Sequence, residues 1–197
     1  MKKVITLFVT MSLLSMTANA QDYYHGVGAK IVYGMYRLNY TSSTIDYQGT
    51  NSAAVPALFY KASLDFSISR STGFTISAYP FVGLAMNLNS TSGASGSFGA
   101  GIPILGEIHF GDLDDACFFI GGGFSAAYLA TIGFGSGSIV GPQLGLGGQL
   151  NLRNKLIGVR CGYTYGLNKT KTTDPDINIS LDRRSMLSFS FYYPLGQ

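Results

Sequence analysis

The sequence has little charge and no tryptophan. Only 12% of its 197 residues are Asp, Glu, Lys or Arg, whereas 46% are hydrophobic. A disordered chain needs low hydrophobicity and high charge, so this composition excludes disorder and is unusual for a cytosolic globular protein. The net charge of +3 comes from 13 basic and 10 acidic residues. So few charges form no concentrated basic surface, and we expect no nucleic-acid partner.

Cysteine is scarce, and the motifs of cofactor sites are missing. Cys117 and Cys161 are too few for a disulfide scaffold. They fall on opposite faces of non-adjacent predicted strands, so we predict no disulfide between them. The 26 glycines show neither a collagen period nor a phosphate loop that opens a helix. The aspartates at 112–115 lack the spacing of a calcium loop, and we expect neither a metal nor a cofactor.

The first 20 residues have the pattern of a secretory signal peptide. Lys2 and Lys3 precede an apolar run at residues 4–16, and Ala18-Asn19-Ala20 supplies a small-x-small cleavage site. We therefore predict a signal peptide over 1–20 and one mature domain over 21–197, which leaves the cytoplasm. An uncleaved membrane anchor is the alternative, but the apolar run is short for a spanning helix.

From residue 21 onward, apolar residues recur with a period of two. Between Phe74 and Asn89, for example, the even positions are nearly all apolar and the odd positions are mixed. Such alternation places the two sets on opposite faces of a strand, whereas a helix needs apolar residues three and four positions apart. The pattern predicts no helix and eight strands, at 26–40, 58–69, 74–89, 98–110, 117–132, 140–152, 157–168 and 184–193.

The connections between these strands differ in length. The gaps at 41–53, 90–97, 133–138 and 169–183 are longer on average and rich in Ser, Thr and Gly, while those at 70–73, 111–116 and 153–155 are short. Long loops at one end and tight turns at the other are typical of an outer-membrane barrel. We therefore predict an all-β, eight-stranded antiparallel up-and-down transmembrane β-barrel.

The charged residues indicate which face points inward. The ionisable residues in the strand interiors all fall on the mixed, glycine-rich face: Lys30, Lys61, Asp65, Glu107, His109 and Arg160. Arg37 breaks this phase, but it lies near a strand end, where a charge can reach water. A charge on the lipid face at mid-depth costs about 2–4 kcal/mol, so the glycine-rich face should line the lumen. A soluble secreted β-sandwich, the alternative fold, would instead be charged or strongly polar outside.

We predict a filled lumen rather than a diffusion pore, because eight strands enclose only enough space for side chains. The expected filling residues are Phe59, Tyr79, Phe81, Leu105, Phe119 and Tyr192, and a lipid-sized cavity is the alternative. Because buried charges need partners, Lys30, Lys61, Asp65, Glu107 and Arg160 are expected to form a lumen salt-bridge network, with a proton or ion path as the alternative. Pro80, Pro103 and Pro142 each remove a ladder donor, which produces a bulge, a bend or a lateral gap.

These features resemble the small bacterial outer-membrane β-barrel proteins of OmpA/OmpX-like architecture. The resemblance is carried by the signal peptide, the eight strands, the loop pattern and the aromatic last strand at 186–193. It implies a bacterial outer membrane location, both termini in the periplasm, contact with lipid and lipopolysaccharide, and a monomer. It also implies recognition of the last strand by the barrel-assembly machinery, although this chain continues past it to Gln197.

We expect a non-enzymatic role, in envelope structure or in surface binding through the extracellular loops. A lipid A-modifying acyltransferase or deacylase is the alternative, since the resemblance includes enzymes that use His with Ser or Asp. His25 and His109 should both lie at the periplasmic end, away from the outer leaflet. The roots of the last loop carry bases that could pair with lipopolysaccharide phosphates, and these are Lys169, Lys171, Arg183 and Arg184.

Overall fold

The computed structural model describes residues 22–42, 46–69, 71–89, 93–131, 135–153, 155–168, 170–174 and 177–196. The predicted signal peptide and the centres of several loops lie outside these ranges. No helix among the described residues is long and apolar enough to cross a membrane.

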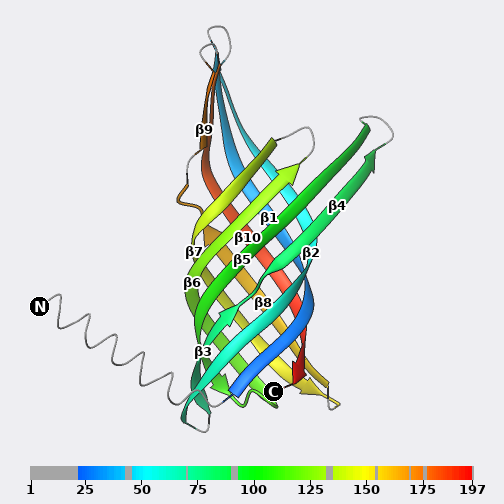
Figure 1. Ribbon diagram of the computed structural model, residues 1–197, viewed down its shortest axis with the longest axis vertical. Helices are drawn as coiled ribbons and strands as arrows, with labels where there is room; N and C mark the ends of the chain where they lie inside the picture. The colour runs from blue at the N-terminus through cyan, green and yellow to red at the C-terminus, as the bar shows by residue number, and fades with distance from the viewer. Residues whose placement is uncertain are drawn as a thin grey trace, which may run out of the picture.

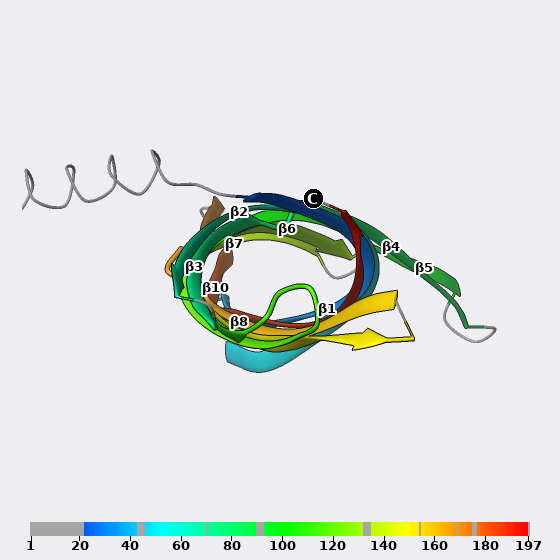
Figure 2. The same cartoon turned by 90° about the horizontal axis from the view of Figure 1, so that it is seen from below.

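The described residues form one antiparallel sheet that closes on itself. Its strands are β1 (Asp22–Ser42), β2 (Asp46–Ser69), β3 (Thr72–Ala78), β4 (Phe81–Asn89), β5 (Gly93–Gly111), β6 (Ala116–Thr131), β7 (Gly135–Leu152), β8 (Lys155–Tyr165), β9 (Thr170–Asp174) and β10 (Ile177–Gly196). Strands that follow one another in sequence are paired, except β3 with β4 and β8 with β9. The first strand, β1, pairs with both β2 and β10, which closes the ring. The ring is evident when the molecule is viewed along its long axis (Figure 2).

Two breaks explain why ten strands make an eight-stranded barrel. Both β3 and β4 pair with β2 on one side and β5 on the other. Together they therefore occupy one strand position of the barrel wall, here called a stave, which is interrupted at Tyr79 and Pro80. The short strand β9 follows β8 in sequence and pairs with the far part of β10. The predicted eight-stranded antiparallel up-and-down barrel is thereby confirmed.

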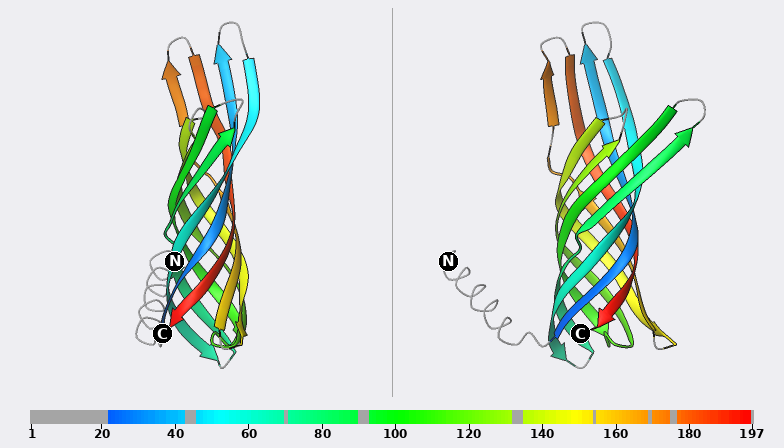
Figure 3. Two further views of the ribbon diagram at one scale, coloured as in Figure 1. Left: turned by 90° about the vertical axis from the view of Figure 1, so that its right-hand side faces the viewer. Right: turned by 45° about the vertical axis from the view of Figure 1, so that its right-hand side comes forward.

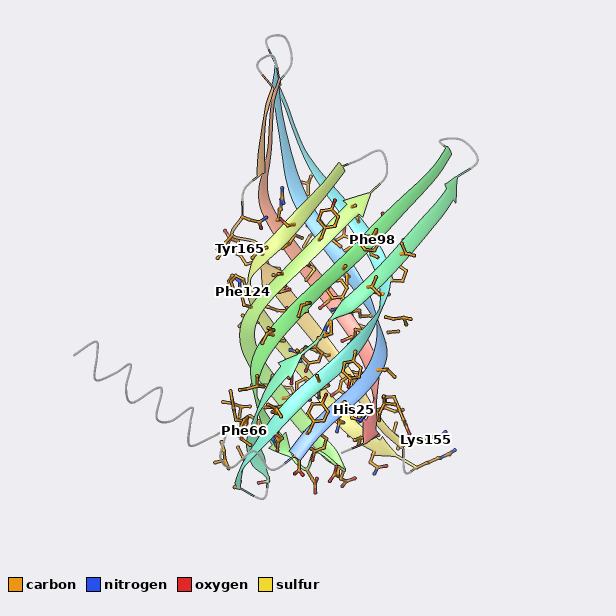
Figure 4. All side chains as sticks on the ribbon, in the orientation of Figure 1. His25, Phe66, Phe98, Phe124, Lys155 and Tyr165 are labelled. Atoms are coloured by element: carbon orange, nitrogen blue, oxygen red, sulfur yellow. The ribbon has the colours of Figure 1, made fainter. Side chains whose placement is uncertain are left out.

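The two faces of the wall differ as the period-two pattern predicts. Outward residues are apolar and exposed, with Leu58 at 70% and Leu84 at 69%. The rings of Phe98, Phe124 and Tyr165 also lie on this outer face (Figure 4). Inward residues are buried, and they include every strand-interior charge named above. An exposed apolar belt around a charged interior is the arrangement of a barrel surrounded by lipid.

The two ends of the barrel differ in height and in their connections. At the lower end of Figure 1, where β1 begins and β10 ends, short turns join the strands. One of them uses Gly111 at φ +106°, a conformation that side chains other than glycine rarely adopt. At the upper end, β1, β2, β9 and β10 extend beyond the ring, and the β4–β5 hairpin leans away from β2 (Figures 1 and 3).

Candidate functional site: the lumen and a side groove

The centre of the lumen is crossed by a buried ion pair between opposite walls. Arg160 of β8 forms this pair with Glu107 of β5. Tyr79 completes the group, since its hydroxyl donates to Glu107 Oε2 at 2.6 Å and accepts from Arg160 Nη1 at 2.6 Å. The guanidinium carbon also lies 4.3 Å from the centroid of the Tyr79 ring. These contacts fasten β8 to β5 across the interior, because β6 and β7 separate the two strands along the wall.

A second polar group lies nearer the lower end. Asp65 of β2 accepts a hydrogen bond from Thr75 Oγ1 at 2.8 Å, and its Oδ1 lies 2.9 Å from His109 Nε2. All three side chains are buried. The partner of Asp65 is thus a histidine, a pairing that sequence periodicity could not show, because it gives the face of a residue but not its neighbours across the lumen.

The two lumen lysines contact aromatic rings instead of carboxylates. Lys30 Nζ lies 4.1 Å from the centroid of the Phe81 ring, and Lys61 Nζ lies 4.8 Å from that of Tyr192. Among the described side chains, neither ammonium is within 4.0 Å of an acidic oxygen. In place of one continuous salt-bridge network, the structure forms two separate acid–base pairs and two cation–π contacts. Buried ammonium groups over ring faces are stabilised by the ring quadrupole.

The lumen is filled by large side chains that face glycines. All six residues expected to fill it are buried there: Phe59, Tyr79, Phe81, Leu105, Phe119 and Tyr192. A side chain at Gly158 would meet the Tyr192 ring, and one at Gly147 would meet the Phe119 ring. A cavity of about 20 Å³ beside Lys61 has room for little more than one water molecule. The lower lumen is therefore packed.

The wall itself opens between β2 and β4. Their pairing is limited to three residue pairs and ends at Ala57–Gly83, above which β2 continues with β1 alone. The β2–β4 pairing ends three residues after Pro80. Pro80 lacks an N–H, although its carbonyl still accepts a hydrogen bond from Tyr60 N at 3.0 Å. Pro103 and Pro142 lie within continuous pairing on their β6 side. On the other side, Pro103 is opposite the interruption at Tyr79, and Pro142 lies just beyond the end of the β7–β8 ladder. Of the three strand prolines, only Pro80 coincides with an interrupted stave.

An apolar groove of about 590 Å³ runs across this region on the outer face. Its small central residue is Ala29 of β1, which pairs with Leu58 on β2 and Phe191 on β10. On the β4 side it is lined by Val82 and Leu84, both outward-facing. We refer to the pocket lined by β1, β2, β4 and β10 as the side groove. The sequence indicated it only through Pro80.

The last loop differs from the expectation at one described position. Arg184 does not face lipid headgroups, since it is 2% exposed and its Nη1 donates to Ser138 O at 2.5 Å. The reason is strand phase: Arg184 lies on the same face of β10 as the buried Met186 and Ser188. Lys169 and the side chains of Lys171 and Arg183 lie outside the described residues.

The remaining candidates show no assembled reactive centre among the described residues. His25 lies at the lower end (Figure 4), where its ring stacks on Tyr23 at 5.9 Å. Cys117 is buried inside, Cys161 is half-buried on the other face, and both are free, as predicted. No three His, Cys, Asp or Glu side chains within the described ranges lie close enough to hold a metal ion.

A closed antiparallel ring with an apolar outer belt defines a transmembrane β-barrel of the outer-membrane type. No family model matches the sequence, and no curated protein matches it. The chain is similar in structure to outer membrane protein OprG from Pseudomonas aeruginosa, at 13% identity and a TM-score of 0.54 over 91% of this chain and 98% of that one. It is also similar to outer membrane protein AlkL, whose structure was determined in lipid bilayers, at 13% identity and a TM-score of 0.53 over 91% and 92%. The predicted outer-membrane barrel architecture is confirmed.

Proposed function

We propose that this protein is a non-enzymatic outer-membrane barrel that binds apolar molecules from the surrounding membrane in its side groove. The observation that carries the proposal is the groove, whose walls are almost entirely apolar and whose volume of about 590 Å³ falls in the range of small-molecule sites. It lies where the stave containing Pro80 separates from β2. The packed lower lumen favours binding at the wall over diffusion through the centre.

The proposed orientation follows the difference between the two ends. Short turns face the periplasm in barrels of this kind, so both termini would be periplasmic. The side groove then lies toward the outer leaflet, in contact with lipid and lipopolysaccharide. A monomer assembled by the barrel-assembly machinery is sufficient for this role, since the groove is built from one chain.

A tryptophan placed in the groove provides a direct test, because the natural chain has none. In Leu84→Trp barrels reconstituted into bilayers, methyl ω-bromododecanoate is expected to quench fluorescence in a saturable way, since bromine quenches a neighbouring indole. The matched reporter is Phe124→Trp, which also lies on the outer face but on β6, a strand that does not line the groove. There we expect only the linear quenching that comes from partitioning into lipid.

Filling the groove should remove the saturable component. Ala29→Phe, combined with the Leu84→Trp reporter, puts a ring between Leu58 and Phe191, whereas Ala126→Phe adds the same ring to the outer face of β6. We expect saturable quenching to disappear in the first and persist in the second. Equal, linear quenching at both reporter positions in the unfilled barrel would overturn the proposal.

Surface binding is the second candidate function, and the height of the upper end favours it. There β1, β2, β9 and β10 extend beyond the closed ring. We propose that Lys169, Lys171 and Arg183, at the roots of the last loop, contact lipopolysaccharide phosphates. Arg184 is not included, because its guanidinium is buried in the lumen.

The non-enzymatic part of the proposal predicts that His109→Ala leaves lipid A acylation unchanged. His109 is buried beside Asp65 at the lower end, far along the barrel from the side groove. Mass spectrometry of lipid A from cells that express each variant at equal folded levels is the measurement. An altered acyl pattern would assign His109 a chemical role and contradict the proposal.

A further inference from the structure

We propose that the turn between β5 and β6, at residues 112–115, is a stopper in which Leu113 seals a blind polar pocket at the lower end of the lumen. Leu113 is the one apolar residue of this turn and lies among three exposed aspartates. Its own side chain is half-buried and packs against the apolar cluster of the lumen. Viewed from below, the turn crosses the opening of the ring (Figure 2).

The pocket behind Leu113 is the cavity of about 20 Å³ beside Lys61. Polar side chains from several strands line it, and they include Ser63 and His109. Ser71 and Arg153, the described residues of the other two lower turns, do not line it. Of the three lower turns, the β5–β6 turn is therefore the one whose described residues reach the pocket.

Groups that water would hydrate are kept dry behind this turn. Lys61 is 9% exposed, and its ammonium lies 4.8 Å from the centroid of the Tyr192 ring. His109 is buried too, and its Nδ1 has no hydrogen-bond partner. A buried polar atom without a partner gains hydrogen bonds as soon as water reaches it. Such atoms near an end of the lumen indicate a seal between them and the solvent.

Strand β7 holds the turn in place. The side-chain amide of Gln149 donates to the carbonyl of Leu113. Asn151 donates twice, from Nδ2 to Asp114 O at 3.2 Å and from its backbone N to Asp115 O at 2.6 Å. These three hydrogen bonds fix the turn over the mouth of the lumen, with the Leu113 side chain toward the pocket and the aspartates toward solvent.

Above the pocket the lumen is closed, so the pocket is blind. Glu107 lines it further up β5 and is bound by Arg160 from the opposite wall. Higher still, Val32 and Val55 are fully buried within the apolar cluster. Removing the stopper should therefore admit water and small solutes to the pocket without opening a path through the barrel.

A cysteine placed in the pocket tests the seal. Ser63→Cys puts a thiol at a buried lining position, in a chain whose own cysteines are removed by Cys117→Ala and Cys161→Ala. The probe is 2-sulfonatoethyl methanethiosulfonate, whose charge keeps it out of the detergent that holds the barrels. We expect slow labelling with Leu113 in place and a rate about tenfold higher or more after Leu113→Ala, because the reaction needs access to the thiol. Leu113→Met conserves the volume and should keep the protection.

Leu152→Ala is the matched control, since Leu152 is a leucine at the lower end that does not line the pocket. Only variants that migrate as folded barrels in unheated gels are compared. Fast labelling with Leu113 in place, or no acceleration after Leu113→Ala, would overturn the stopper. Equal acceleration by Leu152→Ala would also overturn it, because loosening of the whole lower end would then explain the labelling.

Conductance tests the blind end of the pocket. Leu113→Ala barrels in planar bilayers should pass no more current than barrels that retain Leu113, because the lumen above the pocket stays packed. A new, stable conductance in Leu113→Ala would overturn the blind pocket and show that the turn closes a pore.

Discussion

Glu107→Gln is expected to lower the free energy of unfolding by about 3–5 kcal/mol, the usual cost of removing one partner of a buried ion pair. The carboxylate is buried against Arg160 and also accepts the Tyr79 hydroxyl at 2.6 Å. Its loss leaves the guanidinium in the lumen without a counter-charge, while Lys30 and Lys61 remain nearby on the same inner face. Equilibrium unfolding in urea, starting from barrels refolded in detergent, measures the difference.

Removing the arginine as well should restore much of that stability. In the Glu107→Gln, Arg160→Met double variant no uncompensated charge remains from this pair, so we expect a cost well below the sum of the two single substitutions. A coupling energy of about 2 kcal/mol or more, obtained from the four unfolding free energies, would be consistent with the pair as described. Additive single effects would show that the two side chains do not depend on each other.

The sequence predicts the faces of this barrel well because strand geometry is local. Successive side chains point to opposite sides, so Glu107 and Arg160 can each be assigned to the lumen from their own strand alone. Which lumen residues meet is a different question, because it depends on strand tilt and on the stagger of the whole ring. The Arg160–Glu107 pair joins β8 to β5 across the interior, and no spacing along the chain encodes that distance.

The side groove shows the same limit for backbone features. A proline in the sequence indicates only that one backbone N–H is missing from the hydrogen bonds between strands. Pro80, Pro103 and Pro142 all have this effect. Their consequences differ, because only Pro80 lies on the stave whose pairing with β2 ends three residues later, at Gly83. Arg184 is the opposite case, since the local alternation of β10 already places it with Met186 on the inner face.

Leu146→Arg is expected to destabilise the barrel by about 2–4 kcal/mol in bilayers, because Leu146 points outward near the middle of β7 and is half exposed. Leu152→Arg provides the matched control, since Leu152 is an equally exposed leucine on the same strand at the lower end. There the charge can reach the headgroups, and the expected cost is about 0–1 kcal/mol. Unfolding free energies in phosphatidylcholine vesicles give both numbers. Equal costs at the two depths would contradict a lipid-facing outer surface, because an arginine on a solvated face is insensitive to its height along the strand.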